Sequence, residues 1–382
     1  MKRYDIAIIG GGIGGLCAAL SLQQKGHRVN LFEAAKELKP VGAGIGVGSN
    51  SLQALVKLGV GEKVMRQGNV LSKMIIQSHS GKSLNEVDFA SLSKEFGMEN
   101  ITIHRADLQS VLLNGLQEGT VHLNKRYVDF SQDSHDVTVF FEDGDSIRAD
   151  LVIAADGVHS LFRKTLIEDS SERYAGYTCW RSVVSVKEDV LQSNISIETW
   201  GRHGRFGIVP LARDQVYWFA CINASRNDTD KANYKTQDLL SIFKDYPHPI
   251  PEMIQSSNDN QLLHDDILDI KPISQFAFGN VVLIGDAAHA TTPNMGQGAG
   301  QAMEDALFLM ACLEQHYNLR EALQGYQDKR VQRSKKVIKM SRQIGEVAQW
   351  EQPWLTTLRD TLFKLIPSSI ITKRLKFLYD ID

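Results

Sequence analysis

Residues 285–306 read GDAAHATTPNMGQGAGQAMEDA, and the rest of the chain can be placed around this stretch. It follows the apolar run 281–284, Val-Val-Leu-Ile, whose length and β-branching predict a buried strand. From about residue 297 to 313, apolar residues recur at helical spacing. The sequence therefore predicts a strand, an acidic turn, a Pro-Gly loop and a helix, in that order.

This order suits a ligand that carries hydroxyl groups and an anionic or electron-rich ring. Asp286 falls at the carboxyl end of the expected strand, where a carboxylate can accept hydrogen bonds from sugar or polyol hydroxyls. Gly296, Gly298 and Gly300 let backbone N–H groups approach a ligand at a helix start, where the dipole favours negative charge. The alternative is a plain turn before a well-capped helix, but the density of glycines favours a ligand.

A second glycine cluster opens the chain. After an apolar strand that starts at Tyr4, the residues Gly10, Gly12 and Gly15 form G-x-G-x-x-G, followed by a helix and a second strand. Glu33 ends that strand 33 − 15 = 18 positions after the last glycine, near the spacing of a carboxylate that holds ribose hydroxyls. The pattern predicts a dinucleotide site; the alternative is a glycine-rich turn without a ligand.

A third motif lies at 151–160, where a buried strand ends in Asp156-Gly157. Asp-Gly alone is typical of any turn. In their order and separation, however, the motifs at Gly10, Asp156 and Asp286 together resemble the single-component FAD-dependent aromatic hydroxylases. This is the family of para-hydroxybenzoate hydroxylase, and the pattern is nearest to its urate and salicylate hydroxylase-like members.

The resemblance covers nearly the whole chain and implies an α/β fold. A doubly wound, Rossmann-like FAD-binding domain would comprise residues 1–70, 101–175 and 268–320. A β-sheet substrate domain would be inserted as residues 71–100 and 176–267, and residues 321–382 would form C-terminal helices. The family also implies FAD, NADH or NADPH as co-substrate, and O2. The expected reaction is hydroxylation of a small electron-rich aromatic or heteroaromatic substrate through a C4a-hydroperoxyflavin.

The resemblance also assigns roles to single residues. The residue matching Asp286 binds the ribityl chain of FAD, the one matching Arg105 reaches the pyrophosphate, and the one matching Asp156 bridges FAD and the region where the nicotinamide acts. The segment 293–299 is expected against the isoalloxazine ring, and the glycine-rich segment 41–48 is expected to approach a flat ligand. The full set of expected cofactor-binding residues is Gly10, Gly12, Gly15, Glu33, Ala34, Gly46, Arg105, Val128, Asp156, Asp286, Gly296, Gly298 and Ala299.

A hairpin joining 206–209 to 216–220 is expected in the substrate sheet, over the flavin. Arg205 and Tyr217 stand on its facing strands, so both could point into one cavity, and urate-oxidising relatives place an arginine and a tyrosine at matching points. Together with Pro293 they form the expected catalytic set. The alternatives are a solvated arginine at the hairpin end and a sheet tyrosine with a local partner. Residues 91–100 are expected to form a loop.

Composition narrows the class of protein. Hydrophobic residues at 43% and charged residues at 23% fit a soluble globular protein, and a net charge of −3 argues against nucleic acid. The four cysteines are scattered, which argues against a metal site and fits a reducing compartment. Because no stretch of 18 apolar residues exists, we expect no membrane insertion. A cytoplasmic monomer or homodimer is expected.

Several alternatives stay open at this point. The enzyme could epoxidise an isoprenoid or inactivate a polyketide antibiotic such as a tetracycline. A non-catalytic carrier of the same fold, like the prenyl-GTPase escort proteins, is opposed by the intact motif at 286–300. A second dinucleotide fingerprint is missing, so NAD(P)H is expected to bind transiently in a groove. The basic segment 372–379 could touch a membrane, although packing across the pocket mouth or at a dimer interface is the preferred interpretation.

Overall fold

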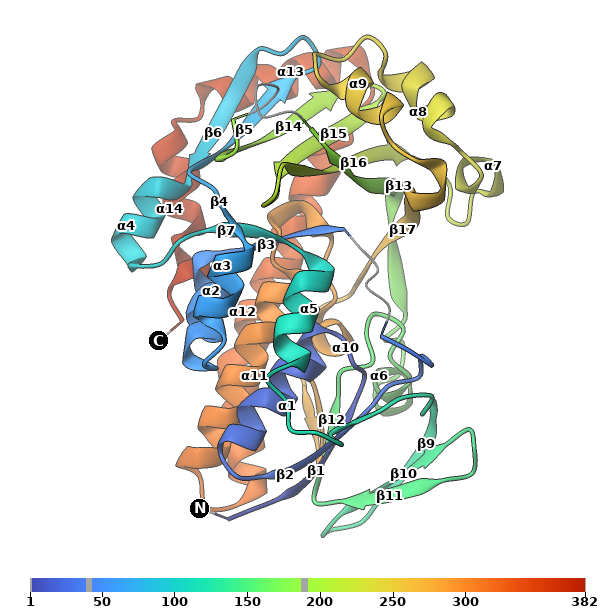
Figure 1. Cartoon of the computed structure of the whole chain (residues 1–382), viewed down its shortest axis with the longest axis vertical. Coiled ribbons are helices and arrows are strands. Elements are labelled where there is room, and N and C mark those ends of the chain that lie inside the picture. Colours follow the sequence, from blue (N-terminus) through green and yellow to red (C-terminus); the bar gives the residue numbers. More distant parts are fainter. Residues whose placement is uncertain (1, 39–42, 187–191, 382) are drawn as a thin grey trace.

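The computed structural model describes residues 2–38, 43–186 and 192–381, so positions 41 and 42 of the glycine-rich segment lie outside the described residues. Figure 1 shows a lower part built on one β-sheet and an upper part built on another, with long helices running along both. The α/β architecture with C-terminal helices that the sequence predicts is confirmed.

The lower sheet has six strands in the order β18-β19-β12-β1-β2-β8. Their bounds are β1 Asp5–Ile9, β2 Arg28–Phe32, β8 Val121–His122, β12 Leu151–Ala154, β18 Ala277–Phe278 and β19 Val281–Leu283. All neighbours are parallel except β18, which is antiparallel to β19. Helices α1 (Ile13–Gln24) and α11 (Gly298–Gln315) pack against each other, and both contribute to the core around this sheet. The central strands are therefore apolar on both faces, as in other parallel sheets.

Three sequence motifs meet at the carboxyl edge of this sheet because β1, β12 and β19 are parallel neighbours. The backbone continues the ladder past the strand ends, with Ala155 N donating to Ile9 O at 2.8 Å and Ile284 N donating to Ala154 O at 3.0 Å. The turns after these strands carry Gly10, Asp156 and Asp286. Ligands of open α/β sheets bind at this edge.

The upper sheet has seven strands in the order β17-β13-β16-β15-β14-β5-β6. Their bounds are β5 Lys73–Ser78, β6 Ser83–Asp88, β13 Glu172–Ser185, β14 Ile195–Gly201, β15 Gly204–Pro210, β16 Gln215–Asn223 and β17 Leu263–Ile270. One face buries Trp180, Phe206 and Trp218 against helices α8 (Thr236–Phe243) and α9 (Ile250–Gln255). The hairpin of β15 and β16 confirms the predicted one, and the opposite face of the sheet is left for a cavity.

Smaller elements complete these two parts. One three-stranded sheet contains β9 Tyr127–Gln132, β10 Val137–Phe141 and β11 Ser146–Ala149, and another contains β3 Gly44–Val47, β4 Asn69–Val70 and β7 Ile101–His104. Further helices are α2 Ser49–Lys57, α3 Gly61–Gln67, α5 Arg105–Leu113, α6 Leu161–Leu166, α7 Thr229–Ala232 and α10 Asp286–His289. Short 3-10 turns cover Asp259–Gln261 and Pro293–Met295.

The predicted loop at 91–100 is wrong in its first half, where the chain forms helix α4 (Phe89–Phe96). The carboxylate of Asp88 caps this helix by accepting a hydrogen bond from Ser91 N at 2.9 Å. Leu92 is buried, and Gly97, at φ 66°, ends the helix in the left-handed conformation. The cap at Asp88, the burial of Leu92 and the terminal Gly97 together stabilise a helix that the short apolar pattern did not predict.

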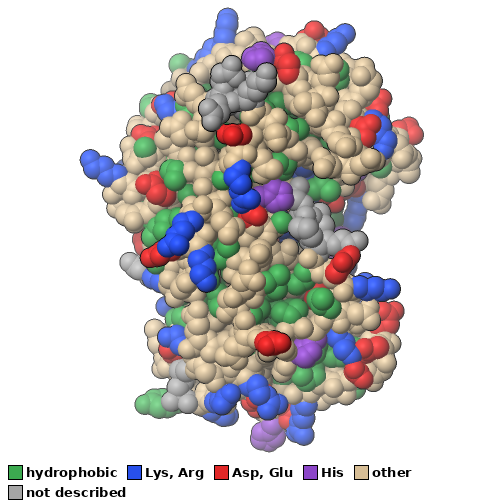
Figure 2. Space-filling model, in the orientation of Figure 1, with side chains coloured by type: hydrophobic (Ala, Val, Ile, Leu, Met, Phe, Trp, Pro, Cys, Tyr) green, Lys and Arg blue, Asp and Glu red, His purple; other side chains and the backbone are tan. Residues whose placement is uncertain are grey.

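Three helices complete the chain: α12 (Leu319–Ala348), α13 (Pro353–Leu365) and α14 (Ser368–Tyr379). With 30 residues, α12 is about 45 Å long and runs from the lower part to the upper part (Figure 1). Among the residues that the structure describes, no helix is long and apolar enough to span a membrane. The surface visible in Figure 2 carries acidic and basic side chains interspersed, and the two kinds are nearly balanced in the sequence, with 45 acidic and 42 basic residues.

Candidate active site

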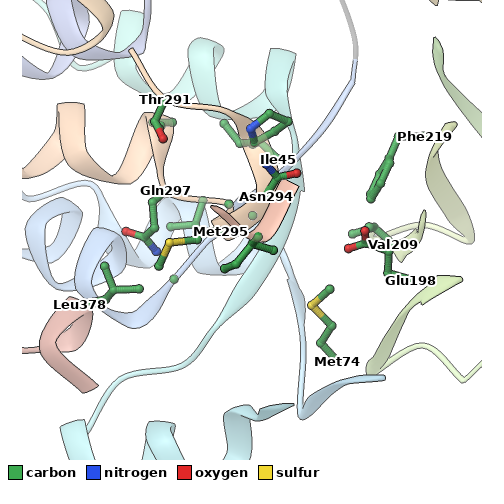
Figure 3. Close-up of a pocket in the computed structure, with 18 of the residues that line it drawn as sticks. Ile45, Met74, Glu198, Val209, Phe219, Thr291, Asn294, Met295, Gln297 and Leu378 are labelled. Atoms are coloured by element: carbon green, nitrogen blue, oxygen red, sulfur yellow. The ribbon is translucent and has the colours of Figure 1, made fainter. Parts of the chain in front are cut away.

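A cavity of about 1520 Å³ lies between the two main sheets. Its lower wall is formed by the turns after β1, β12 and β19, and its upper wall by the free face of the seven-stranded sheet. Figure 3 shows Glu198, Val209 and Phe219 on the sheet side, across the cavity from Asn294 and Met295. The cavity thus brings the predicted cofactor motifs and the predicted substrate hairpin to one place.

The three glycines of the N-terminal fingerprint have different surroundings. Gly10 has φ 111°, and a Cβ there would overlap the carbonyl oxygen of Ala155. A Cβ at Gly15 would overlap the carbonyl oxygen of Gly10, so this position is fixed by helix–strand packing. At Gly12, by contrast, a Cβ would meet nothing within 4 Å, and the residue borders the cavity. The bare backbone at Gly12 is therefore available to a ligand.

The carboxylate of Glu33 is held close to this turn. Its Oε2 accepts a hydrogen bond from Gly11 N at 2.7 Å, and its Oε1 accepts one from Ala35 N at 2.8 Å. Glu33 borders a second cavity of about 520 Å³, which shares Gly12 with the large one. Each carboxylate oxygen keeps acceptor capacity for a further donor, such as a ribose hydroxyl. Ala34 lies beside it without lining either cavity.

Asp286, at the start of α10, and Arg105, at the start of α5, both line the large cavity. Neither side chain has a hydrogen-bonding partner elsewhere in residues 2–38, 43–186 or 192–381. Asp286 is exposed to the cavity, but the surrounding walls deprive its carboxylate of water and raise its pKa; His289 and Arg105 act in the opposite sense. A carboxylate without a protein partner at this depth is suited to accept hydrogen bonds from a polyol.

Behind this motif lies a buried ion network that sequence reasoning missed. Asp305 Oδ2 accepts hydrogen bonds from Gly285 N at 2.7 Å and His289 Nε2 at 2.6 Å, and its Oδ1 accepts one from Arg330 Nε at 2.6 Å. Burial alone would raise the pKa of Asp305, but His289 and Arg330 outweigh it and lower the pKa to about 2. Gly285 has φ 57°, so Asp305 fixes the turn that presents Asp286.

The structure does not place Asp156 or Val128 on the cavity wall. Asp156 caps α6, since its Oδ2 accepts a hydrogen bond from Leu161 N at 2.9 Å, whereas its neighbours Ala155 and Gly157 do line the cavity. Val128 lies on β9 and is 49% exposed. Contact of these two residues with the cofactor therefore stays a prediction, and neither side chain reaches the cavity in this structure.

The remaining expected cofactor residues surround the centre of the cavity. Gly46, Pro293, Gly296, Gly298 and Ala299 all line it. A Cβ at Gly46 or Gly296 would meet nothing within 4 Å, as at Gly12. Gly12, Gly46 and Gly296 therefore offer bare backbone to a ligand in the cavity.

Arg205 and Tyr217 face the same cavity, as predicted from their strands. Arg205 pairs with Cys221 and Tyr217 with Val209 in the register of β15 and β16, so both side chains emerge on one face. The hydroxyl of Tyr217 has no hydrogen-bonding partner in the described part of the chain, and burial raises the pKa of this phenol, which keeps it protonated. Tyr217 can therefore donate to a ligand as well as accept from it.

Arg205 is not the solvated hairpin-end arginine of the alternative interpretation, although it lines the cavity. It is only 2% exposed, and its Nη1 donates to Glu198 Oε1 at 3.0 Å. Its Nη2 donates to Asn294 Oδ1, which also accepts from the hydroxyl of Tyr177 at 3.1 Å. The guanidinium thus joins the upper sheet to the loop that carries Pro293, and its charge is already paired. Nothing in the spacing of residues 198, 205 and 294 could have indicated this cluster.

A second arginine on the same face is paired as well. Arg181 on β13 is the direct neighbour of Phe219 on β16, and it forms an ion pair with Asp265. Both residues of this pair line the cavity. Each arginine that the seven-stranded sheet turns toward the cavity therefore has its own carboxylate.

The cavity extends beyond this polar region into an apolar branch. The branch runs between the edge of the sheet and the C-terminal helices, and both Met74 and Leu378, labelled in Figure 3, line it. Its apolar lining residues are Met74, Ile76, Val87, Phe89, Met340, Ile344, Val347, Phe363, Ile366, Ile371, Leu375, Phe377 and Leu378. The C-terminal helices therefore form part of the cavity wall, as the preferred interpretation of the tail proposed.

The lower half of the cavity fits FAD. Helices α1 and α11 both begin at it, and their N-cap residues, Gly12 and Gln297, make no side-chain cap hydrogen bond. Their first-turn N–H groups and dipoles are available to anionic groups such as a pyrophosphate or a reduced flavin ring. Together with Asp286, Arg105 and Glu33, these features supply partners for ribityl, phosphate and ribose groups. The fold and the site define an FAD-dependent oxidoreductase.

Comparison with known proteins agrees with this class. Residues 3–341 match a family model described as an FAD binding domain. The chain is 37% identical to the aurachin C monooxygenase/isomerase of Stigmatella aurantiaca over 369 residues, which cover 97% of this chain and 96% of the relative. It is 32% identical to the 2-heptyl-3-hydroxy-4(1H)-quinolone synthase of Pseudomonas aeruginosa over 369 residues, 95% of this chain and 94% of the relative.

Among solved structures, HpxO of Klebsiella pneumoniae complexed with FAD and uric acid superposes with a TM-score of 0.90 at 30% identity, covering 98% of this chain and 96% of that one. The chain belongs to the family of FAD-dependent aromatic hydroxylases. It is an FAD-dependent monooxygenase, which confirms the interpretation as an enzyme over that as a non-catalytic carrier.

Proposed function

We propose that this protein uses FAD, NADH or NADPH, and O2 to hydroxylate a neutral heteroaromatic ring that carries an apolar chain. The observation that carries the proposal is the pairing of the two arginines that the seven-stranded sheet turns toward the cavity, Arg205 with Glu198 and Arg181 with Asp265, at the head of an apolar branch. The first feature concerns the charge of the substrate, and the second concerns its shape.

The charge argument rests on desolvation. An anionic aromatic substrate would need a cation to offset the loss of hydration on entering the cavity. Arg205 and Arg181 could supply that charge only by giving up their carboxylates, which would then be left unpaired. Arg105, at the start of α5, is expected to pair with the pyrophosphate of FAD. The upper wall therefore favours an uncharged ring with hydrogen-bonding groups, for which the free hydroxyl of Tyr217 is a suitable partner.

The shape argument rests on the apolar branch. Its methionine, isoleucine, leucine and phenylalanine side chains would bury an alkyl or prenyl chain, each buried methylene contributing roughly 0.8 kcal/mol. A small ring such as urate would leave this space unfilled. The compound for which the quinolone synthase of Pseudomonas aeruginosa is named, 2-heptyl-3-hydroxy-4(1H)-quinolone, is a neutral bicyclic ring with a heptyl chain and so combines both properties.

In this reaction the residues of the chain would have the following roles. When bound, FAD supplies the activation of oxygen and the transfer of reducing equivalents. Glu33, Arg105 and Asp286 hold the cofactor, and the N-terminus of α11 favours negative charge on its ring. Arg205 fixes Asn294 and with it the loop at Pro293, while Tyr217 orients the ring of the substrate. The apolar walls exclude water from the reacting atoms.

The test is a comparison of substrates with the FAD-loaded enzyme. NADH and NADPH oxidation would be followed with 2-heptyl-4(1H)-quinolone, urate, salicylate and a tetracycline, and the products identified by mass spectrometry. We expect the quinolone to stimulate oxidation and to yield a hydroxylated product. Stimulation by urate or salicylate but not by the quinolone would overturn the proposal, as would turnover of the tetracycline alone. A quinolone without the alkyl chain is the control for the apolar branch and should show a higher KM.

A further inference from the structure

We propose that the outer face of helices α13 and α14 docks on a membrane surface that contains anionic lipids, and that an apolar substrate reaches the cavity from there. The docking itself is independent of the function proposed above. Only the route of the substrate rests on that function. Figure 1 shows α13 on the outer side of the β5–β6 edge and α14 close to α4.

An apolar stripe faces outward on α13. Trp354, Leu358, Leu362 and Leu365 follow one another in steps of four, four and three residues, which places them on one side of the helix. They are exposed by 67, 43, 49 and 72%, and Ile370 just beyond is exposed by 46%. These five account for nearly half of the twelve large hydrophobic side chains that are exposed in the described residues. A surface stripe of this kind marks an interaction site.

The stripe is not needed to hold α13 in place, because the opposite side of the helix already does so. Phe363 packs against Trp200 with a centroid distance of 4.7 Å, and Arg359, only 1% exposed, donates to the carbonyl oxygen of Ala348 at 3.0 Å. The helix therefore has one apolar side in the core and a second that faces outward.

The basic residues around the stripe favour a partner surface that is anionic. Residues 352–376 contain five basic residues, of which Arg359 is buried beside Asp360 and Lys376 pairs with Glu95. Lys364, Lys373 and Arg374 are exposed. Amphipathic helices with basic residues beside an apolar face lie in the plane of anionic membranes. A second copy of the chain is a poorer occupant, because a two-fold interface would bring two such basic clusters together.

The inner face of the same helices forms the wall of the cavity. Phe363 and Ile366 of the α13 end and Ile371 and Leu375 of α14 line the apolar branch. Lys373 and Arg374 line it too while remaining exposed, so the cavity wall reaches the surface beside the stripe. A chain-bearing substrate that partitions into lipid would find an apolar passage at this point.

The test is co-sedimentation of the full-length, FAD-loaded protein with vesicles. One set contains phosphatidylcholine alone, and the other also contains phosphatidylglycerol. We expect binding to the second set that weakens with salt. Trp354→Ser with Leu365→Ser should weaken it roughly tenfold or more, and Lys373→Ser with Arg374→Ser should weaken it by a similar factor and remove most of the salt dependence. The matched control is Tyr317→Ser, which removes a side chain that is 97% exposed elsewhere.

The flavin spectrum and the thermal unfolding of each variant show that it is folded. Absence of binding by the wild-type protein, or equal binding by the stripe variant, would overturn the docking. So would a wild-type dimer in solution that the stripe variant converts to a monomer, since a second copy would then cover the stripe. Docking without turnover of the quinolone would leave the docking established and overturn the proposed substrate instead.

Discussion

At the scale of single residues, the glycines of the fingerprint have two different roles: one is expected to contact the ligand and another is needed for folding. Gly12→Ala adds a Cβ into open space, so we expect apo-protein stability close to wild type but FAD binding weaker by roughly tenfold or more. Gly15→Ala places a Cβ on the carbonyl oxygen of Gly10 and should lower the melting temperature of the apo-protein itself. Fluorescence titration with FAD and thermal unfolding measure the two effects. Equal loss of stability in both variants would contradict this assignment.

Asp286 is expected to hold the polyol chain of FAD. Asp286→Ala removes a charged acceptor and should weaken FAD binding by about 1.5–3 kcal/mol, measured by titration of the apo-protein. The control is Asp266→Ala, which removes another carboxylate of the cavity wall, on the side of β17. If Asp286→Ala kept its FAD while remaining folded, the carboxylate would have another role.

Arg205 is expected to act through its buried contacts. Arg205→Ala would leave the carboxylate of Glu198 buried without its cation, so we expect a loss of about 3–5 kcal/mol in the free energy of unfolding. The loop at Asn294 would also lose a contact, which should increase peroxide release per NAD(P)H consumed. Tyr217→Phe is the control: it should keep stability within about 0.5 kcal/mol and raise the KM. Stability of Arg205→Ala equal to wild type would contradict the paired arrangement.

At the scale of elements, the network of Asp305 ties α11 and α12 to the strand end at Gly285. The pKa of Asp305 is lowered to about 2 from an ordinary value of 3.8, so the unfolded chain binds the proton more readily. Its stabilising contribution is therefore complete above about pH 4 and is lost as the pH falls toward 2. Urea unfolding of wild type and Asp305→Asn should show a stability difference that shrinks over this range. A difference independent of pH would contradict the assignment.

The same scale shows what the sequence could predict. The strand after residue 280 and the hairpin of β15 and β16 follow from local sequence, because apolar and β-branched residues dominate these segments. Helix α4 was missed because its apolar pattern is short and its stability comes from the cap at Asp88 and the burial of Leu92. The local sequence pattern therefore predicts poorly those helices and strands that are stabilised mainly by tertiary contacts.

At the scale of the whole molecule, the lower half of the site could be predicted and the upper half only in part. Parallel strands carry their carboxyl ends to one edge, so three motifs far apart in the sequence had to meet. The pairing of Arg205 with Glu198 and Asn294 depends on sheet register and on a loop, neither of which the sequence displays. The proposed domain boundaries, including the division at residue 268, stay a prediction.

The central claim is that this enzyme inserts oxygen from O2 into a neutral ring held below the paired arginines. The most direct measurement is incubation of the FAD-loaded enzyme with NAD(P)H, 2-heptyl-4(1H)-quinolone and oxygen gas labelled with oxygen-18, followed by mass spectrometry. We predict a hydroxylated quinolone that carries one labelled oxygen atom. Oxidation of NAD(P)H with only peroxide formed, or label found in urate and not in the quinolone, would contradict the account.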